Sequence, residues 1–339
     1  MSAKKLRGSG GEKSPSTMEQ QAKINEIRKM AGPITSKFPM LFSDASISRY
    51  LRARNWHTKK ASKLLKETLR WRLEYKPEKI QWEDVADEAK TAKLYQADYL
   101  DKWGRTVLIM RPGIQSMSSI DVQIKYFIYC MERAIMGLKP DQEQMVWLID
   151  FQGWNMSSIS VKVIRETAHI LQDHYPERLA LAILYNPPKV FEPFWLMVKP
   201  FLEPKTYKKV KFVFPDDPQS LKIMEELFDM DRLEPFFGGR NSIGFEYQAY
   251  AKRMVKEDEK MNNSINSGSS PPCASIMTSE LQQMETSSDL NSELSDEGDS
   301  SSTDKAIIVS NMEGAEDKIQ DPQLCCNEVA KAELDAIKI

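Results

Sequence analysis

The fold is decided by residues 171–214, which read LQDHYPERLALAILYNPPKVFEPFWLMVKPFLEPKTYKKVKFVF. Within this stretch, LALAILY is a continuous apolar run of strand length that ends at Asn186-Pro187-Pro188, as is typical of a strand covered on both faces. The next segment, VFEPFWLMV, is apolar nearly all round, whereas an ordinary surface helix carries a polar face. VKFVF then predicts a second strand, which begins beside Lys208 and Lys209.

Two interpretations of the apolar helix are open on pattern alone. One is an ordinary core helix of an α/β domain, which the pattern favours. The other is a helix that covers an apolar cavity and can move away from it. Both require apolar neighbours on most sides of VFEPFWLMV.

The segments before this stretch complete an α/β pattern. KLYQADYLDKWGRTVLIMRPG predicts two strands joined by a tight turn at residues 101–104. A long helix follows, with Ile124, Phe127 and Ile128 on its apolar face, and then MVWLID predicts a buried strand. A further helix leads into LQDHY. The order strand, strand, helix, strand, helix, strand, apolar helix, strand predicts an α/β domain with a mixed sheet.

The two ends of the chain differ from this domain. A helix that begins at Thr17 as its N-cap and two further helices, with Leu64, Leu65 and Leu69 as an apolar stripe, predict a small all-helical unit. Aromatic residues vanish near the C-terminus, where Ser, Asn, Asp and Glu dominate. We therefore expect a disordered segment at 1–15, the helical unit at 16–80, the α/β domain at 81–255 and a disordered acidic, Ser-rich tail at 256–339.

Charge is divided unequally along the chain. From Lys256 to the end there are 18 acidic and 6 basic residues, so the overall charge of -2 leaves a net charge of +10 on residues 1–255. A basic body suits an anionic membrane surface or a phosphorylated ligand. The sequence contains no run of Lys and Arg with interleaved aromatic residues, so it does not predict a nucleic-acid partner. The basic N-terminus lacks an apolar core, which predicts neither a signal peptide nor a membrane span.

The sequence lacks the common catalytic motifs. There is no P-loop, no GxGxxG after a strand, no HExxH, no CxxC and no GxSxG. Three histidines, His57, His169 and His174, are scattered, and four cysteines show no metal-ligand spacing. Asp150 has no matching base or nucleophile, which favours a role in ending its strand or capping a neighbour over that of a catalytic carboxylate. We expect a protein that is not an enzyme and that uses no metal or cofactor.

Several of these motifs together carry a resemblance. YLRARNW, KLLKETLRWR, DKWGRTVLIMRPG, LIDFQGW, HYPERLALAILYNPP, FLEPKTYKKVKFV and FFGG occur in one order across residues 24–255. In this the chain resembles CRAL-TRIO lipid-binding proteins, specifically the Sec-fourteen-like phosphatidylinositol transfer proteins of fungi and plants. The resemblance implies a mixed sheet that floors an apolar lipid cavity, closed by a gating helix at residues 190–202. Its implied gating residues are Val190, Phe191, Phe194, Trp195, Leu196, Met197, Val198, Phe201 and Leu202.

The resemblance also implies a lipid head-group site. Its principal residues fall on Arg54, Glu177 and Lys209, and Thr206 and Lys208 are weaker candidates. A phosphate diester requires fixed cationic donors, and an ionised glutamate accepts hydrogen bonds from hydroxyls, which inositol has and choline lacks. Spacing alone favours an ordinary ion-pair network for these residues.

The implied function is phosphatidylinositol binding and transfer between membranes, with presentation of the lipid to inositol-lipid kinases as a further use. The alternative is a carrier of one hydrophobic small molecule such as a tocopherol, retinoid or sterol. A second phospholipid is a further implied partner, but Met145 and Trp147 stand where relatives that bind phosphatidylcholine have small hydroxyl residues. Trp147 is either a cation-π face or a core residue. We expect a cytoplasmic monomer that associates reversibly with anionic membranes.

Overall fold

The computed structural model describes residues 15–158 and 160–264. It begins with four helices, α1(Thr17–Ala31), α2(Ile34–Lys37), α3(Asp44–Ala53) and α4(Thr58–Tyr75). These helices have a hydrophobic cluster of their own, and the predicted stripe Leu64, Leu65 and Leu69 is buried in it. The helical N-terminal region is therefore confirmed.

The N-cap of α1 differs from the prediction by one residue. The hydroxyl of Ser16 accepts a hydrogen bond from the backbone N–H of Glu19, whose carboxylate accepts one from the N–H of Ser16. A capping box requires the acidic residue three positions after the cap, and Ser16 satisfies this spacing with Glu19. Thr17 is instead the first residue of the helix.

Five strands form one sheet among the described residues: β1(Leu94–Leu100), β2(Thr106–Met110), β3(Met145–Asp150), β4(Leu179–Tyr185) and β5(Val210–Val213), in that spatial order. β1 and β2 are antiparallel, and the other neighbouring pairs are parallel. The turn between β1 and β2 is stabilised by the carboxylate of Asp101, which accepts hydrogen bonds from the backbone N–H groups of Trp103 and Arg105 at 3.0 and 2.8 Å. The predicted mixed sheet is confirmed.

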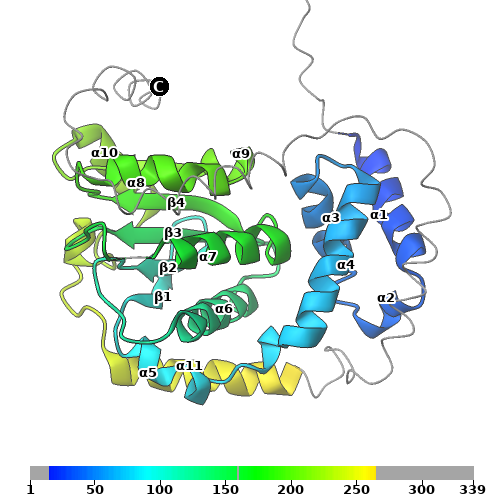
Figure 1. The fold of residues 1–339 in the computed structure, drawn as a ribbon, viewed down its shortest axis with the longest axis horizontal. Helices are drawn as coiled ribbons and strands as arrows, with labels where there is room; N and C mark the ends of the chain where they lie inside the picture. The colour runs from blue at the N-terminus through cyan, green and yellow to red at the C-terminus, as the bar shows by residue number, and fades with distance from the viewer. Residues whose placement is uncertain (1–14, 159, 265–339) are drawn as a thin grey trace, which may run out of the picture. The chain divides into compact units, whose positions relative to one another are not determined.

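Helices connect the parallel strands and lie next to the sheet (Figure 1). They are α6(Ile120–Met136), α7(Val161–His174) and α8(Phe191–Val198), which continues into η3(Lys199–Phe201) and α9(Pro204–Tyr207). The remaining elements are η1(Pro77–Lys79), η2(Trp82–Asp84), α5(Ala86–Ala89), α10(Pro218–Leu227), η4(Pro235–Phe237) and α11(Tyr247–Ser264). None of the helices in the described ranges is long and apolar enough to cross a membrane.

The boundary predicted at residue 255 falls inside α11, which continues to Ser264. Asp258 is buried, and its carboxylate accepts hydrogen bonds from Nε of Arg133 and from the hydroxyl of Tyr129, both at 2.8 Å. The segment after residue 255 is so polar that its sequence predicts a solvated chain, yet one of its carboxylates neutralises a buried guanidinium. The rest of the predicted tail, and residues 1–14, lie outside the described residues.

Candidate functional site

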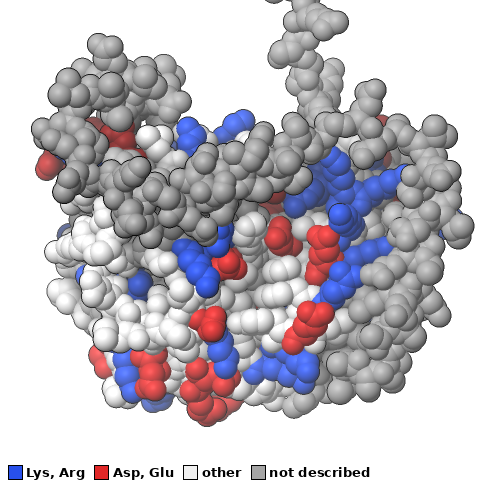
Figure 2. All heavy atoms as spheres, viewed as in Figure 1, with Lys and Arg blue, Asp and Glu red and all other residues white. Residues whose placement is uncertain are grey.

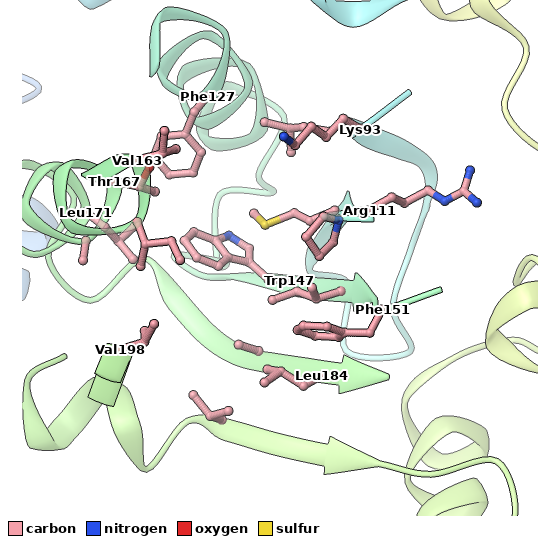
Figure 3. Close-up of a pocket in the computed structure, with 18 of the residues that line it drawn as sticks. Lys93, Arg111, Phe127, Trp147, Phe151, Val163, Thr167, Leu171, Leu184 and Val198 are labelled. Atoms are coloured by element: carbon pink, nitrogen blue, oxygen red, sulfur yellow. The ribbon is translucent and has the colours of Figure 1, made fainter. Parts of the chain in front are cut away.

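An apolar cavity of about 280 Å³ lies between the sheet and helices α6, α7 and α8. Figure 3 shows side chains entering it from α6 and α7, from the strands and from the α8 region. The strands contribute Leu94, Met110, Trp147, Ile149, Leu179, Ala182, Leu184 and Val210. The few polar side chains in its wall include Lys93 and Gln123. A cavity of this composition suits a hydrocarbon ligand.

Helix α8 covers this cavity with its apolar face. Phe191, Phe194 and Val198 are buried and line the cavity. Phe191 packs edge-on against Phe151 at a ring-centroid distance of 4.5 Å, and Phe194 packs against Trp154 at 5.0 Å. The helix therefore covers a cavity, as the second interpretation of the sequence requires, rather than filling a solid core.

The other predicted gating residues lie on both sides of α8. Val190 and Leu196 are exposed by 58% and 52%, so they form the outward face. Trp195 is half-buried and packs on Phe212 of β5, with ring centroids 5.5 Å apart. Half-buried positions are also found for Met197, Phe201 and Leu202. Residues 190–202 are called the lid segment below.

Trp147 forms part of the cavity wall. It is 9% exposed and meets Phe127 edge-on at 5.8 Å, and no Lys or Arg of the described residues lies over its ring. Met145 is fully buried. Between the two interpretations of Trp147, the structure favours the core residue over the cation-π face.

A second, polar pocket of about 30 Å³ adjoins the apolar cavity, and Leu171, Leu179 and Thr206 line both. We call it the head-group pocket. Three of the predicted head-group residues, Glu177, Thr206 and Lys209, line it. Its other lining residues are Ala53, Gln172, Tyr175, Pro176, Glu203 and Lys205.

Glu177 and Lys209 form an ion pair in this pocket, with 3.0 Å between Oε2 and Nζ. Both side chains are mostly buried, with exposures of 15% and 23%. The backbone of Glu177 has φ of +58°, in the left-handed region that residues with a Cβ seldom adopt. Such conformations tend to cluster at functional sites, where the surrounding structure enforces them.

Arg54 reaches the same region from the end of α3. Its Nη1 lies 3.1 Å from Oε1 of Glu203, a residue of the pocket wall, and the preceding Ala53 also lines the pocket. The structure thus brings Glu177, Thr206 and Lys209 together around one pocket, and Arg54, which is not a lining residue, contacts its wall through Glu203. Lys208 is exposed and lines neither the pocket nor the cavity.

Sequence reasoning missed several residues of this pocket, among them Gln172, Glu203 and Lys205. The ammonium of Lys205 donates a hydrogen bond to the carbonyl oxygen of Arg52. Lys205 lies in α9 and Lys209 lies between α9 and β5, so helical spacing does not relate the two lysines. Glu203 and Gln172 gave no sequence signal either.

The pocket combines cationic donors with carboxylate acceptors, which is the set that a phosphate carrying hydroxyl groups requires. Among the described residues, no cluster of His, Cys, Asp and Glu could hold a metal ion. The carboxylate of Asp150 forms an ion pair with Nε of Arg111 at 3.2 Å and accepts a hydrogen bond from the N–H of Gln152. It has the structural role that the sequence favours.

His174 has a packing role at the end of α7. Its ring stacks on Trp71 at 4.1 Å, with 7° between the planes. Burial, together with the nearby guanidinium of Arg72, lowers the pKa of His174 to about 4. The imidazole is therefore neutral at physiological pH and joins α7 to α4.

Comparison with known proteins supports the resemblance that the sequence motifs carry. Residues 89–239 match the CRAL/TRIO domain. The match covers less than half of the chain and agrees with the fold that the sequence motifs predict. The Sec-fourteen-like resemblance is also confirmed by the relatives described next.

Two curated fungal proteins are 32% identical to the chain. The CRAL-TRIO domain-containing protein C23B6.04c of Schizosaccharomyces pombe aligns over 211 residues, 62% of this chain and 20% of its own length. Phosphatidylinositol transfer protein PDR17 of Saccharomyces cerevisiae aligns over 222 residues, 62% of this chain and 61% of its own length. The chain therefore spans less than two thirds of each.

SEC14 cytosolic factor of Kluyveromyces lactis is 29% identical over 251 residues, 66% of this chain and 79% of that protein. Among solved structures, the crystal structure of Sfh5 superposes with a TM-score of 0.57 over 73% of this chain and 97% of that chain, at 16% identity. This last similarity supports the fold.

Proposed function

We propose that this protein binds phosphatidylinositol and transfers it between membranes. The observation that carries the proposal is the connection between an apolar cavity and the head-group pocket through shared wall residues. Acyl chains would occupy the cavity, and the inositol phosphate would meet Arg54, Glu177, Thr206 and Lys209. The relative PDR17, which is named a phosphatidylinositol transfer protein, supports the choice of lipid.

The chemistry of each contact supports this arrangement. The guanidinium and ammonium of Arg54 and Lys209 offer charge-assisted hydrogen bonds to phosphate oxygens. The carboxylate of Glu177 is an acceptor only, so it selects ligand hydroxyls. Each of these side chains already has a partner within the protein, so a bound lipid exchanges one set of hydrogen bonds for another.

The size of the cavity requires the lid segment to move. Drug-sized ligands occupy pockets of ~300–1,000 Å³, and the closed cavity has about 280 Å³. A lipid with two acyl chains therefore requires a larger cavity than the closed form provides. Displacing α8 would expose Phe191, Phe194 and Val198, at roughly 5–9 kcal/mol if all three entered water. A membrane interior would accept these side chains without that penalty, so we expect the lid to open at a membrane.

The outer surface supports membrane contact. Val190 and Leu196 already face outward, and Lys189 beside them is exposed. Figure 2 shows that Lys and Arg occur in patches with Asp and Glu between them on the visible face. Docking would therefore combine attraction between the basic body and anionic lipid with insertion of apolar lid residues.

We further propose that a second phospholipid replaces phosphatidylinositol at the membrane. The bulk of Met145 and Trp147 argues against phosphatidylcholine in this role. Presentation of the bound lipid to inositol-lipid kinases would follow from the same opening of the lid. None of these steps makes or breaks a covalent bond, so we propose a carrier and not an enzyme. We also propose that the carrier acts as a monomer.

The test is a transfer assay with the full chain, in which donor vesicles contain labelled phosphatidylinositol and acceptor vesicles contain none. We expect label to accumulate in the acceptor vesicles at a rate proportional to protein concentration. A correctly folded protein that moves no label would reject the proposal.

The small closed cavity also suits a single hydrophobic molecule, such as a tocopherol, retinoid or sterol. That alternative assigns no ligand contact to Arg54, Glu177 or Lys209. Mass spectrometry of lipid extracted from freshly purified protein separates the two: an inositol phospholipid supports the proposal, and a neutral lipid alone supports the alternative.

A further inference from the structure

The head-group pocket already contains a negatively charged group that can be displaced. Oε1 of Glu203 lies 3.1 Å from Nη1 of Arg54, and Glu203 forms part of the pocket wall. We infer that Glu203 occupies the place of the lipid phosphate while the pocket is empty, and that a bound phosphate takes Arg54 away from it. The inference rests on the proposed function and adds a residue that controls occupancy of the same site.

The charges of the pocket favour such a displacement. Glu177 neutralises Lys209, and Glu203 neutralises Arg54. A phosphate that entered without displacing either carboxylate would meet two negative charges. Of the nearby cations among the described residues, only Lys205, which donates to the carbonyl oxygen of Arg52, is not held by one of these carboxylates. A carboxylate that moves away removes one negative charge and gives the ligand a second cation.

Glu203 is the carboxylate that can leave more easily. Its side chain is 38% exposed, compared with 15% for Glu177, so its charge can turn into water. Glu177 is also fixed by the turn before β4, where Arg178 donates a hydrogen bond to the carbonyl of Glu143. Glu203 instead directly follows the lid segment.

The same ion pair helps to hold the lid closed. The side-chain amide of Gln172 on α7 donates to the carbonyl of Phe201 at 3.0 Å, and its oxygen accepts from the N–H of Glu203 at 2.6 Å. The residues on both sides of Leu202 are thus bound to α7, and Glu203 is also bound to Arg54, which directly follows α3. When a phosphate binds Arg54, the ion pair between Arg54 and Glu203 breaks, and the end of the lid segment loses this contact with the end of α3. Head-group binding therefore favours lid opening.

The expected size of the effect follows from the exposure of the pair. Partly exposed ion pairs contribute little free energy, which corresponds to about a twofold to fivefold change in an equilibrium constant. A ligand that must first break this pair binds more weakly by the same factor. Glu203→Gln should therefore tighten the binding of water-soluble dioctanoyl phosphatidylinositol to the full chain by about twofold to fivefold.

Glu192→Gln is the matched control, because Glu192 is an exposed acidic residue of the lid segment outside the head-group pocket. It removes the same charge, and affinity should stay unchanged. In an Arg54→Gln background, binding should be weaker and Glu203→Gln should bring no further gain. A gain that persists without Arg54 would mean that Glu203 only repels the phosphate, and would overturn the inference.

Hydrogen exchange of residues 199–207 without any lipid provides a second readout. Faster exchange in Glu203→Gln than in Glu192→Gln supports the anchoring of the lid end, and equal exchange together with equal affinity overturns it. If the unaltered protein binds no dioctanoyl phosphatidylinositol, the proposed function fails. The exchange comparison would still decide whether Glu203 fastens the lid.

Discussion

At the scale of single residues, the position of Glu177 is the most informative. A left-handed backbone at a residue with a Cβ costs on the order of 1–2 kcal/mol. The turn before β4 nevertheless keeps this conformation and directs the carboxylate to Lys209. Such strain is consistent with a residue that is placed for binding rather than for stability.

Removing either member of this pair should abolish phosphatidylinositol transfer. Lys209→Ala removes a phosphate donor, and Glu177→Ala removes the acceptor for inositol hydroxyls. The vesicle transfer assay is the measurement, and circular dichroism should show an intact fold. Lys208→Ala, with the same loss of charge at the neighbouring exposed position, should retain transfer. Global unfolding of both pocket variants would assign the pair a purely structural role.

His174 should make the stability of the protein depend on pH. Because burial lowers its folded-state pKa to about 4 from an ordinary value of 6.5, only the unfolded chain gains this proton between these values. The free energy of unfolding should therefore fall as pH decreases from about 6.5 to about 4. His174→Phe retains an aromatic ring for Trp71 but cannot titrate. Its melting temperature should drop less than that of the unaltered protein between pH 7.5 and pH 5, and equal drops would contradict the prediction.

The sequence predicted the types of head-group residue better than their neighbours. Glu177, Thr206 and Lys209 line one pocket and Arg54 contacts its wall through Glu203, but their binding roles remain predictions. Lys208 is exposed to solvent. The sequence did not predict this, because spacing around a helix of one turn does not reveal which side chain faces inward. Glu203 was missed because its partner is Arg54, 149 residues earlier in the chain.

At the scale of secondary structure, the order of strands and helices was predictable because each segment has a clear period. The β1–β2 hairpin followed from its turn, and β4 from its apolar run. The covering role of α8 was not predictable from periodicity, because an apolar helix looks alike over a cavity and in a solid core. The resemblance supplied that distinction.

The outward face of α8 should determine membrane binding. Leu196→Asp places a charge where an apolar side chain is half exposed, so vesicle binding and transfer should both weaken several-fold. Ile243→Asp, at an exposed apolar residue outside the lid segment, is the control and should bind normally. Sedimentation with anionic vesicles measures the effect. Equal binding of both variants would exclude the lid as a docking surface.

At the scale of the whole molecule, buried charges join elements that are far apart in sequence. Arg72 of α4 binds Glu132 of α6 through two contacts of 2.9 Å, and Tyr175 donates to the same carboxylate at 2.6 Å. Arg133 and Asp258 link α6 to α11 in the same way. Sequence patterns did not predict these links, because a charged residue gives no sign of burial until its distant partner is known.

The end of α11 is therefore part of the fold. A chain that stops after Val255 loses Asp258 and leaves Arg133 buried without its carboxylate, which should lower the free energy of unfolding by about 3–5 kcal/mol. A chain that stops after Ser264 keeps this ion pair and should match the full chain. Urea denaturation of the two truncated chains measures the difference. Equal stability would show that the last turns of α11 contribute nothing.

If the protein carries lipid as proposed, the apolar cavity beneath α8 has a consequence for the direction of lipid traffic. A carrier that couples to no chemical energy source can only equalise the composition of the two bilayers it visits. An apolar cavity without lipid would expose its wall to water, which costs free energy. Each departing lipid should therefore be replaced before the protein leaves the membrane. The flow would then be set by whichever bilayer makes inositol lipid and whichever consumes it, and the protein would hasten that flow without steering it.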